Sequence, residues 1–237
     1  MDVYQTEEEQ VESIKKWWAE NSRAIIFGIG LGLFAVFGWQ AWKDQQQSHA
    51  VEASDLYQQL VTTMQKPNFD AAISLAVELD EKYTETPYGA LAGLYKAKAE
   101  LERTDSKAAV ASLERVVEIA DNNSIQHVAR LRAFRIRVGE GDVEGVIKDV
   151  DSVLAEENGV NPGEFIGQYE EIKGDGYRLL GDVEKARHGY IAALRTATLN
   201  RRLIQLKLDD LGPPPAKFGA SEQKKSQANN VEGESEG

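Results

Sequence analysis

The 237-residue sequence contains no cysteine and only three histidines. Without cysteine the chain has no disulfide, thiol nucleophile, thiolate zinc site or iron–sulfur cluster, because each needs sulfur from that residue. The histidines, His49, His127 and His188, lie far apart, so no pair has the short helical spacing that builds a metal site. We therefore expect neither a metal nor another cofactor.

Positive charge is also scarce: 27 Lys and Arg stand against 39 Asp and Glu, a net charge of −12. Affinity for a phosphate backbone comes from Lys and Arg that release counterions, so nucleic acid is not an expected partner. The one dense basic run lies on a single expected helix, where its arginines should fan over the outer face. They either form ion pairs with neighbouring acidic helices or, through Arg132 and Arg135, bind an acidic segment of a partner.

Catalytic motifs are missing as well. Neighbouring carboxylates occur, for example Glu170 with Glu171 and Asp209 with Asp210, but they fall on polar helix faces where solvation explains them. No nucleophile elbow or phosphate-binding loop is found. The sequence therefore predicts a protein that is not an enzyme.

One long hydrophobic run is present: residues 24–42 carry no charge, and their 19 residues approach the ~20 needed to cross a bilayer. Tryptophans flank the run, with Trp39 and Trp42 in its last turn, where headgroups are expected. Gly28 and Gly32 form a small-x-x-x-small pair on which another transmembrane helix could pack. Two alternatives stay open, a buried core helix and a signal peptide cleaved near residues 48–50.

Basic residues predict the orientation of this span. Lys15, Lys16 and Arg23 precede it, whereas only Lys43 follows it closely. Positive flanks stay on the cytoplasmic side, so residues 1–23 should be cytoplasmic and residues from 43 onward should lie across the membrane, in a bacterium the periplasm. Residues 11–18 fit either an interfacial helix or an extension of the span.

Beyond the span the pattern is helical. Apolar periodicity near 3.6 predicts helices over 44–65, 69–83, 88–103, 106–120, 124–138, 142–157, 163–180, 183–197 and 199–211. The tetrapeptide Gly-Asp-Val-Glu begins at residue 141 and again at residue 181, each time at the start of a helix that its aspartate could cap.

Around the second copy, six small and aromatic residues sit at offsets 0, 3, 7, 12, 16 and 19, a spacing typical of the tetratricopeptide repeat: Gly174, Tyr177, Gly181, Ala186, Tyr190 and Ala193. Earlier helices repeat the second half of the pattern, beginning at Ala72, Ala109 and Val146. The intervals of 37, 37 and 40 residues exceed the usual ~34 and indicate a degenerate repeat. A plain up-down helical bundle is the alternative.

These patterns predict an all-α protein with a single N-terminal transmembrane helix followed by a tetratricopeptide-like helical-repeat solenoid. Its expected segments are a cytoplasmic start (1–23), the span (24–42), a periplasmic repeat domain (43–211) and a tail (212–237). The tail begins Gly-Pro-Pro-Pro and continues with small and polar residues, too few of them apolar to form a core, so we expect it to be disordered.

The sequence resembles a known family, the YfgM-like ancillary subunits of the bacterial SecYEG translocon. The resemblance covers about residues 1–211 and is carried by residues 9–12, 14–15, 20–21, 38–39, 42, 88–92 and 173–187. It implies a single-pass inner-membrane protein that associates with channel subunits of the translocon and with a membrane-anchored periplasmic chaperone of the prolyl-isomerase type. It also implies a link to an envelope-stress response regulator, and it assigns no individual binding residues.

We expect the span to tether a scaffold beside the translocon, where the repeat domain binds a partner chaperone or an emerging client. The first helices of each repeat usually line the groove of such domains, which makes six residues candidates for partner contact, with core packing as their alternative role: Tyr88, Leu91, Tyr95, Tyr169, Lys173 and Tyr177. The competing function is a tethered adaptor for cell-envelope or division machinery that has no role in translocation.

Overall fold

A computed structural model describes residues 7–66, 68–196 and 200–213, and this part of the chain is helical, without a strand. Two short 3-10 turns, Glu157–Gly159 and Gly163–Phe165, precede α7. The α-helices are α1 (Glu7–Met64), α2 (Phe69–Lys82), α3 (Pro87–Glu102), α4 (Ser106–Ile119), α5 (Asn123–Gly139), α6 (Val143–Leu154), α7 (Ile166–Leu179), α8 (Val183–Thr196) and α9 (Arg201–Asp210).

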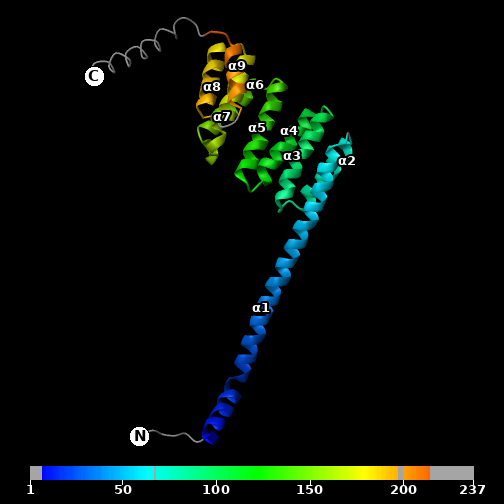
Figure 1. The fold of residues 1–237 in the computed structure, drawn as a ribbon, viewed down its shortest axis with the longest axis vertical. Helices are drawn as coiled ribbons and strands as arrows, with labels where there is room; N and C mark the ends of the chain where they lie inside the picture. Colours follow the sequence, from blue (N-terminus) through cyan, green and yellow to red (C-terminus); the bar gives the residue numbers. More distant parts are fainter. Residues whose placement is uncertain (1–6, 67, 197–199, 214–237) are drawn as a thin grey trace, which may run out of the picture.

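Helix α1 joins the hydrophobic segment to the repeat domain without a break. It continues through the expected boundaries at residues 23 and 42, so the separate helix expected over 44–65 is its last part. Figure 1 shows α1 as a rod whose last turns lie beside α2 and α3 while the rest projects away. Residues 11–18 continue the same helix, which agrees with the extension rather than with a separate interfacial helix.

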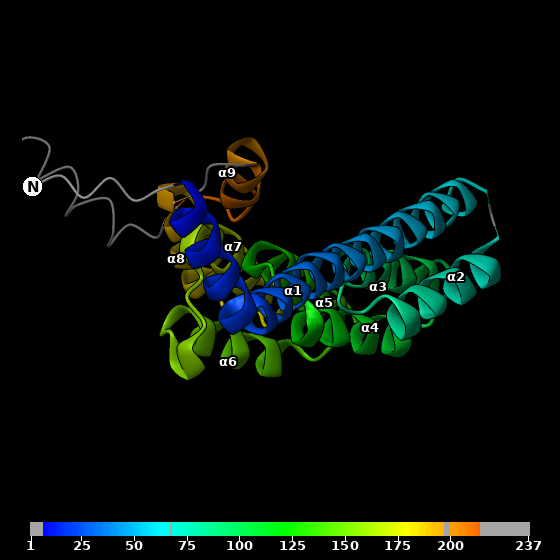
Figure 2. The same ribbon diagram turned by 90° about the horizontal axis from the view of Figure 1, so that it is seen from below.

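The other helices pack in sequence order into a repeat array (Figure 2), in which each contacts its neighbours along the chain. The positions that define the repeat in the sequence form its core. Exposure is at most 7 % at all twelve: Ala72, Ala76, Leu79, Ala109, Leu113, Val116, Val146, Val150, Val153, Ala186, Tyr190 and Ala193. The expected tetratricopeptide-like architecture is confirmed, because burial of one helix face at repeat intervals is what a solenoid requires.

The last repeat shows why its small residues are needed. A Cβ on Gly174 would lie 2.7 Å from two ring carbons of Tyr190, and a Cβ on Gly189 would lie 2.9 Å from the backbone of Gly174. The two glycines therefore let α7 and α8 approach closely over the tyrosine ring. Gly181, between these helices, has φ +77°, a left-handed conformation that L side chains rarely adopt.

The two Gly-Asp-Val-Glu copies differ in their caps. Asp182 accepts a hydrogen bond from the backbone N–H of Lys185 (3.1 Å), as expected. Asp142 precedes α6 but its carboxylate makes no capping bond, so that expectation is wrong. Instead it binds Arg137, which donates from Nε at 2.8 Å and contacts it through Nη2 at 2.7 Å. The expected disordered tail falls mainly on residues 214–237, outside the described residues.

Candidate partner-binding surfaces

The apolar segment of α1 is exposed to its surroundings. None of its 18-residue hydrophobic window is buried against the described chain, and Phe27 and Phe34 are about 80 % exposed. This rules out the buried core helix. Outside the neighbouring backbone of α1 itself, no atom of the described residues lies within 4 Å of a Cβ built on Gly28 or Gly32, so the small-residue face is open to another helix. A 19-residue helix is ~28 Å long, close to the thickness of a bilayer core.

The end of this segment carries its tryptophans. The rings of Trp39 and Trp42 lie 5.2 Å apart, and both side chains are more than half exposed. Because indole rings prefer the headgroup region, the pair fits the boundary between the span and the following solvated turns of α1.

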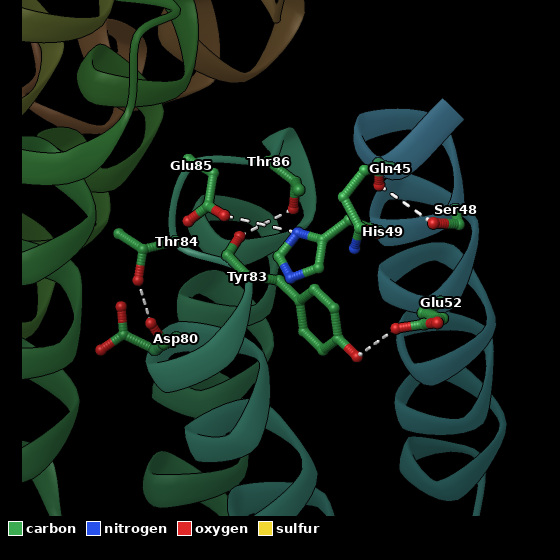
Figure 3. A network of polar contacts seen from close by, with 9 residues as sticks. All are labelled: Gln45, Ser48, His49, Glu52, Asp80, Tyr83, Thr84, Glu85 and Thr86. Atoms are coloured by element: carbon green, nitrogen blue, oxygen red, sulfur yellow. Dashed lines mark hydrogen bonds and ion pairs between the residues drawn. The ribbon is translucent and has the colours of Figure 1, made fainter. Parts of the chain in front are cut away.

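Helix α1 is fastened to the repeat domain just beyond the span (Figure 3). His49 Nδ1 lies 3.4 Å from a carboxylate oxygen of Glu85, and its ring contacts the ring of Tyr83 at 4.6 Å between centroids. The Tyr83 hydroxyl donates to Glu52 at 3.3 Å. His49 lies seven residues after Trp42, about 10 Å along a helix. The turn between α2 and α3 is therefore held close to the end of the span.

Two expected partner-binding tyrosines belong to an aromatic cluster between α1 and α3. The Tyr57 ring lies 5.4 Å from that of Tyr88 and 5.7 Å from that of Tyr95. Burial, and secondly the neighbouring Tyr95, raises the pKa of Tyr57 to about 12, so the Tyr57 hydroxyl keeps its proton at neutral pH. Tyr88, Tyr95 and nearby Leu91 remain partly exposed. The two tyrosines stabilise the packing of α1 and still present part of their surface outward.

The four arginines of α5 have different environments, which corrects the expectation that all fan over the outer face. Arg137 is held by Asp142 and by Asp149, each 2.7 Å away, so the ion-pair interpretation is right for this residue. Arg130 is half-buried beside Tyr169 and opposes the rise that burial causes in the pKa of that tyrosine.

Arg132 and Arg135 are exposed and lie at the edge of a groove between α3 and α5. This α3–α5 groove has a volume of about 320 Å³ and is mostly apolar. Its lining residues come from three helices: Leu94, Ala97, Lys98, Leu101, Leu113, Arg132, Arg135 and Ile136. The structure thus places the two arginines together, with an apolar floor that the sequence pattern did not reveal.

The three candidates on α7 lie in different environments. Tyr169 is fully buried and contacts His127, whose Nδ1 lies 2.8 Å from the tyrosine hydroxyl, so it is a core residue and the expectation of partner contact is wrong there. Lys173 forms an ion pair with Asp151 at 2.5 Å. Tyr177 packs against the last core cluster and is partly exposed.

A buried ionic network between α7, α8 and α9 was not predicted from the sequence. Glu171, expected on a polar face, is only 5 % exposed, and Lys207 of α9 reaches it at 2.6 Å. The same ammonium lies 2.7 Å from Asp175, which also accepts a hydrogen bond from the Tyr190 hydroxyl at 2.8 Å. Because Lys207 lies 36 residues from Glu171 in the sequence, helical periodicity alone could not have paired them. The network ties α9 to α7 and α8.

Within the described ranges, no group of three or more His, Asp or Glu side chains is placed to hold a metal ion. The surfaces that the structure presents are suited to binding other molecules. They comprise exposed aromatic and aliphatic side chains, an apolar groove with a basic edge, and the exposed apolar segment of α1.

Comparison with known protein families agrees with this geometry. The tetratricopeptide repeat-like domain family matches residues 15–213. The chain belongs to this family. A solved structure of nearly identical TPR-like repeats from Podosopora anserina shares the fold, with a TM-score of 0.50 at 16 % identity over 78 % of this chain and 93 % of the other.

Three curated relatives, each named an ancillary SecYEG translocon subunit, extend over most of this family member. The Escherichia coli protein is 28 % identical over 89 % of this chain and 99 % of its own length. The corresponding values are 26 %, 88 % and 100 % for the protein of Haemophilus influenzae. They are 29 %, 86 % and 97 % for that of Aggregatibacter actinomycetemcomitans. The family resemblance inferred from the sequence is confirmed.

Proposed function

We propose that this protein is a non-catalytic scaffold, anchored in the bacterial inner membrane by α1, which acts beside the Sec translocon. The observation that carries the proposal is the match over nearly the full length of relatives named as ancillary translocon subunits. The exposed span and the repeat domain supply the two parts that such a role needs. The family resemblance adds a membrane-anchored prolyl-isomerase-type chaperone and an envelope-stress response regulator as partners.

Tethering gives the repeat domain its physical advantage. The continuous α1 and its contacts through His49 and Tyr83 hold the domain near the membrane surface. A domain confined next to a channel meets its partners at a high effective concentration, so weak contacts with a chaperone or an emerging client are occupied. The open face around Gly32 and the partly exposed surface around Tyr95 are the surfaces proposed for these contacts.

Photo-crosslinking in living cells tests the proposal. A photoreactive phenylalanine analogue replaces Gly32 or Trp39 in the span and Tyr95 or Tyr177 in the domain, and mass spectrometry identifies the adducts. We expect channel subunits from the span positions, and the chaperone or a nascent chain from the domain positions. The exposed Lys148 on α6 serves as the control site. Capture of division or envelope-assembly proteins alone would replace the proposal by the adaptor function.

The orientation has its own test, because the chain lacks cysteine and single substitutions give a clean signal. We propose a cytoplasmic N-terminus and a periplasmic repeat domain. A membrane-impermeant thiol reagent should then label Lys148→Cys in intact spheroplasts and Ser13→Cys only after permeabilisation. The reverse labelling would overturn the proposed orientation, and labelling of neither site before permeabilisation would place both on the cytoplasmic side.

A further inference from the structure

We propose that the α3–α5 groove is a docking site for an acidic segment of a protein partner that also carries large apolar side chains. The floor of the groove is apolar and partly open to water. Leu101 is 40 % exposed there, above the nearly buried Leu113 and Ala97. Apolar surface left open to water at a concave site is stabilised when another apolar side chain covers it.

The edge of the groove supplies the charge preference. Lys98, Arg132 and Arg135 form no ion pair with an acidic group in residues 7–66, 68–196 or 200–213. Such a cluster is notable in a chain of net charge −12, where acidic neighbours are plentiful. Arg137, on the same helix, forms ion pairs with the carboxylates of Asp142 and Asp149. The three groove cations are thus left available to carboxylates from outside, which guanidinium groups bind in a bidentate manner.

The two features together select the occupant. Three cations beside an apolar floor suit a short peptide that alternates carboxylates with large apolar residues. A phosphate backbone offers no apolar groups for the floor, and its approach would be opposed by the net negative charge of the chain. Leu94 and Lys98 lie one helical turn apart on α3, so the groove wall offers such a peptide an apolar contact on one turn and a charged contact on the next.

The chain's own tail fits less well. Residues 214–237 contain two large apolar side chains, Phe218 and Val231, and their three lysines would oppose binding at a basic edge. The three glutamates near the end follow Val231 without a further large apolar residue. A partner segment is therefore the better occupant of a groove of about 320 Å³. Peptide binding at the α3–α5 groove does not depend on the translocon.

The test is a selection from a random 12-residue phage-display library on the full chain in phosphatidylcholine nanodiscs. We expect the enriched peptides to share a net negative charge and at least one Leu, Ile, Phe or Trp. The most enriched peptide, made synthetically with a fluorescent label, should bind at least tenfold more weakly to the Arg132→Glu/Arg135→Glu variant. Its affinity should also fall severalfold between 50 and 300 mM salt, because the contacts are ionic. Leu101→Ser should weaken it independently of salt.

The matched control is Lys107→Glu/Lys148→Glu, which changes the net charge equally at exposed sites that do not line the groove. We expect it to bind the peptide within twofold of the unmodified chain, and circular dichroism checks that both variants keep their helices. Enrichment of basic or uncharged peptides, or equal loss in both variants, would overturn the proposal. A threefold or larger gain after deletion of residues 214–237 would also overturn it, because the tail would then be the occupant.

Discussion

Lys207 of α9 should hold the end of the repeat domain in place, and its replacement by methionine tests this. The ammonium lies 2.6 Å from Glu171 and 2.7 Å from Asp175. Loss of the cation leaves the carboxylate of Glu171, 5 % exposed, without its partner. Breaking a buried pair typically costs 3–5 kcal/mol. Since the Lys207 side chain keeps 22 % of its exposure, we expect Lys207→Met to lower the free energy of opening α9 by about 3 kcal/mol, the lower end of that range.

Hydrogen exchange measured by mass spectrometry on the full chain in nanodiscs is the suitable assay, because α9 can open without global unfolding. About 3 kcal/mol corresponds to a rise of roughly two orders of magnitude in the exchange of α9 amides, since 1.4 kcal/mol is a factor of ten. The exchange rates of the α3 amides should not change. The control Arg202→Met removes an exposed charge from the same helix and should alter α9 exchange less than threefold.

A double variant separates electrostatics from packing. Adding Glu171→Gln to Lys207→Met removes the buried charge as well as its partner, so most of the protection should return. If Lys207→Met changes α9 exchange less than threefold, or if the double variant is no better protected than the single one, the ion pairs of Lys207 do not hold α9 in place. Burial of Ile204, 1 % exposed, would then be what holds α9.

Three further predictions concern the core. Burial, and secondly the charge of a neighbouring arginine, lowers the pKa of His127. The unfolded chain therefore binds a proton at this histidine that the folded chain does not. Urea midpoints should not depend on this group above about pH 6.5, and below it the free energy of unfolding should fall by up to about 1.4 kcal/mol per pH unit. His127→Gln should remove that part of the pH dependence. Gly174→Ala places a methyl group against the tyrosine ring 2.7 Å away and should cost about 1–3 kcal/mol by thermal denaturation, whereas Gly139→Ala, with open space around it, should cost nothing measurable. Leu60→Ala empties a fully buried site of α1 and should cost about 2–5 kcal/mol by the same measurement, against less than about 1 for the exposed Val51→Ala; equal effects would contradict the core assignment.

Much of the architecture was predictable from the sequence because its causes are local. A charge-free run of 19 residues is apolar whatever surrounds it, and the structure leaves it exposed as an isolated helix. Helical periodicity fixed which face of each helix is apolar. The recurrence of small residues at Ala72, Ala109 and Ala186 then revealed the repeat, because close helix crossings need small side chains at equivalent places.

Tertiary structure decided the roles of residues that look alike in the sequence. Glu170 and Glu171 are neighbours, yet only Glu171 is buried, because α9 brings Lys207 to it. Likewise, Arg137 is neutralised by α6, whereas Arg132 and Arg135 meet only an apolar groove at the α3 side.

Composition and periodicity therefore predict the apolar span and the helices, because both act within one helix, and the recurrence of small residues from helix to helix predicts the repeat. Which charges are buried, which are paired and which are left open to a partner depends on how the helices pack against one another. The free energy of a charged side chain depends on the groups around it, and in this fold those groups come from distant parts of the chain.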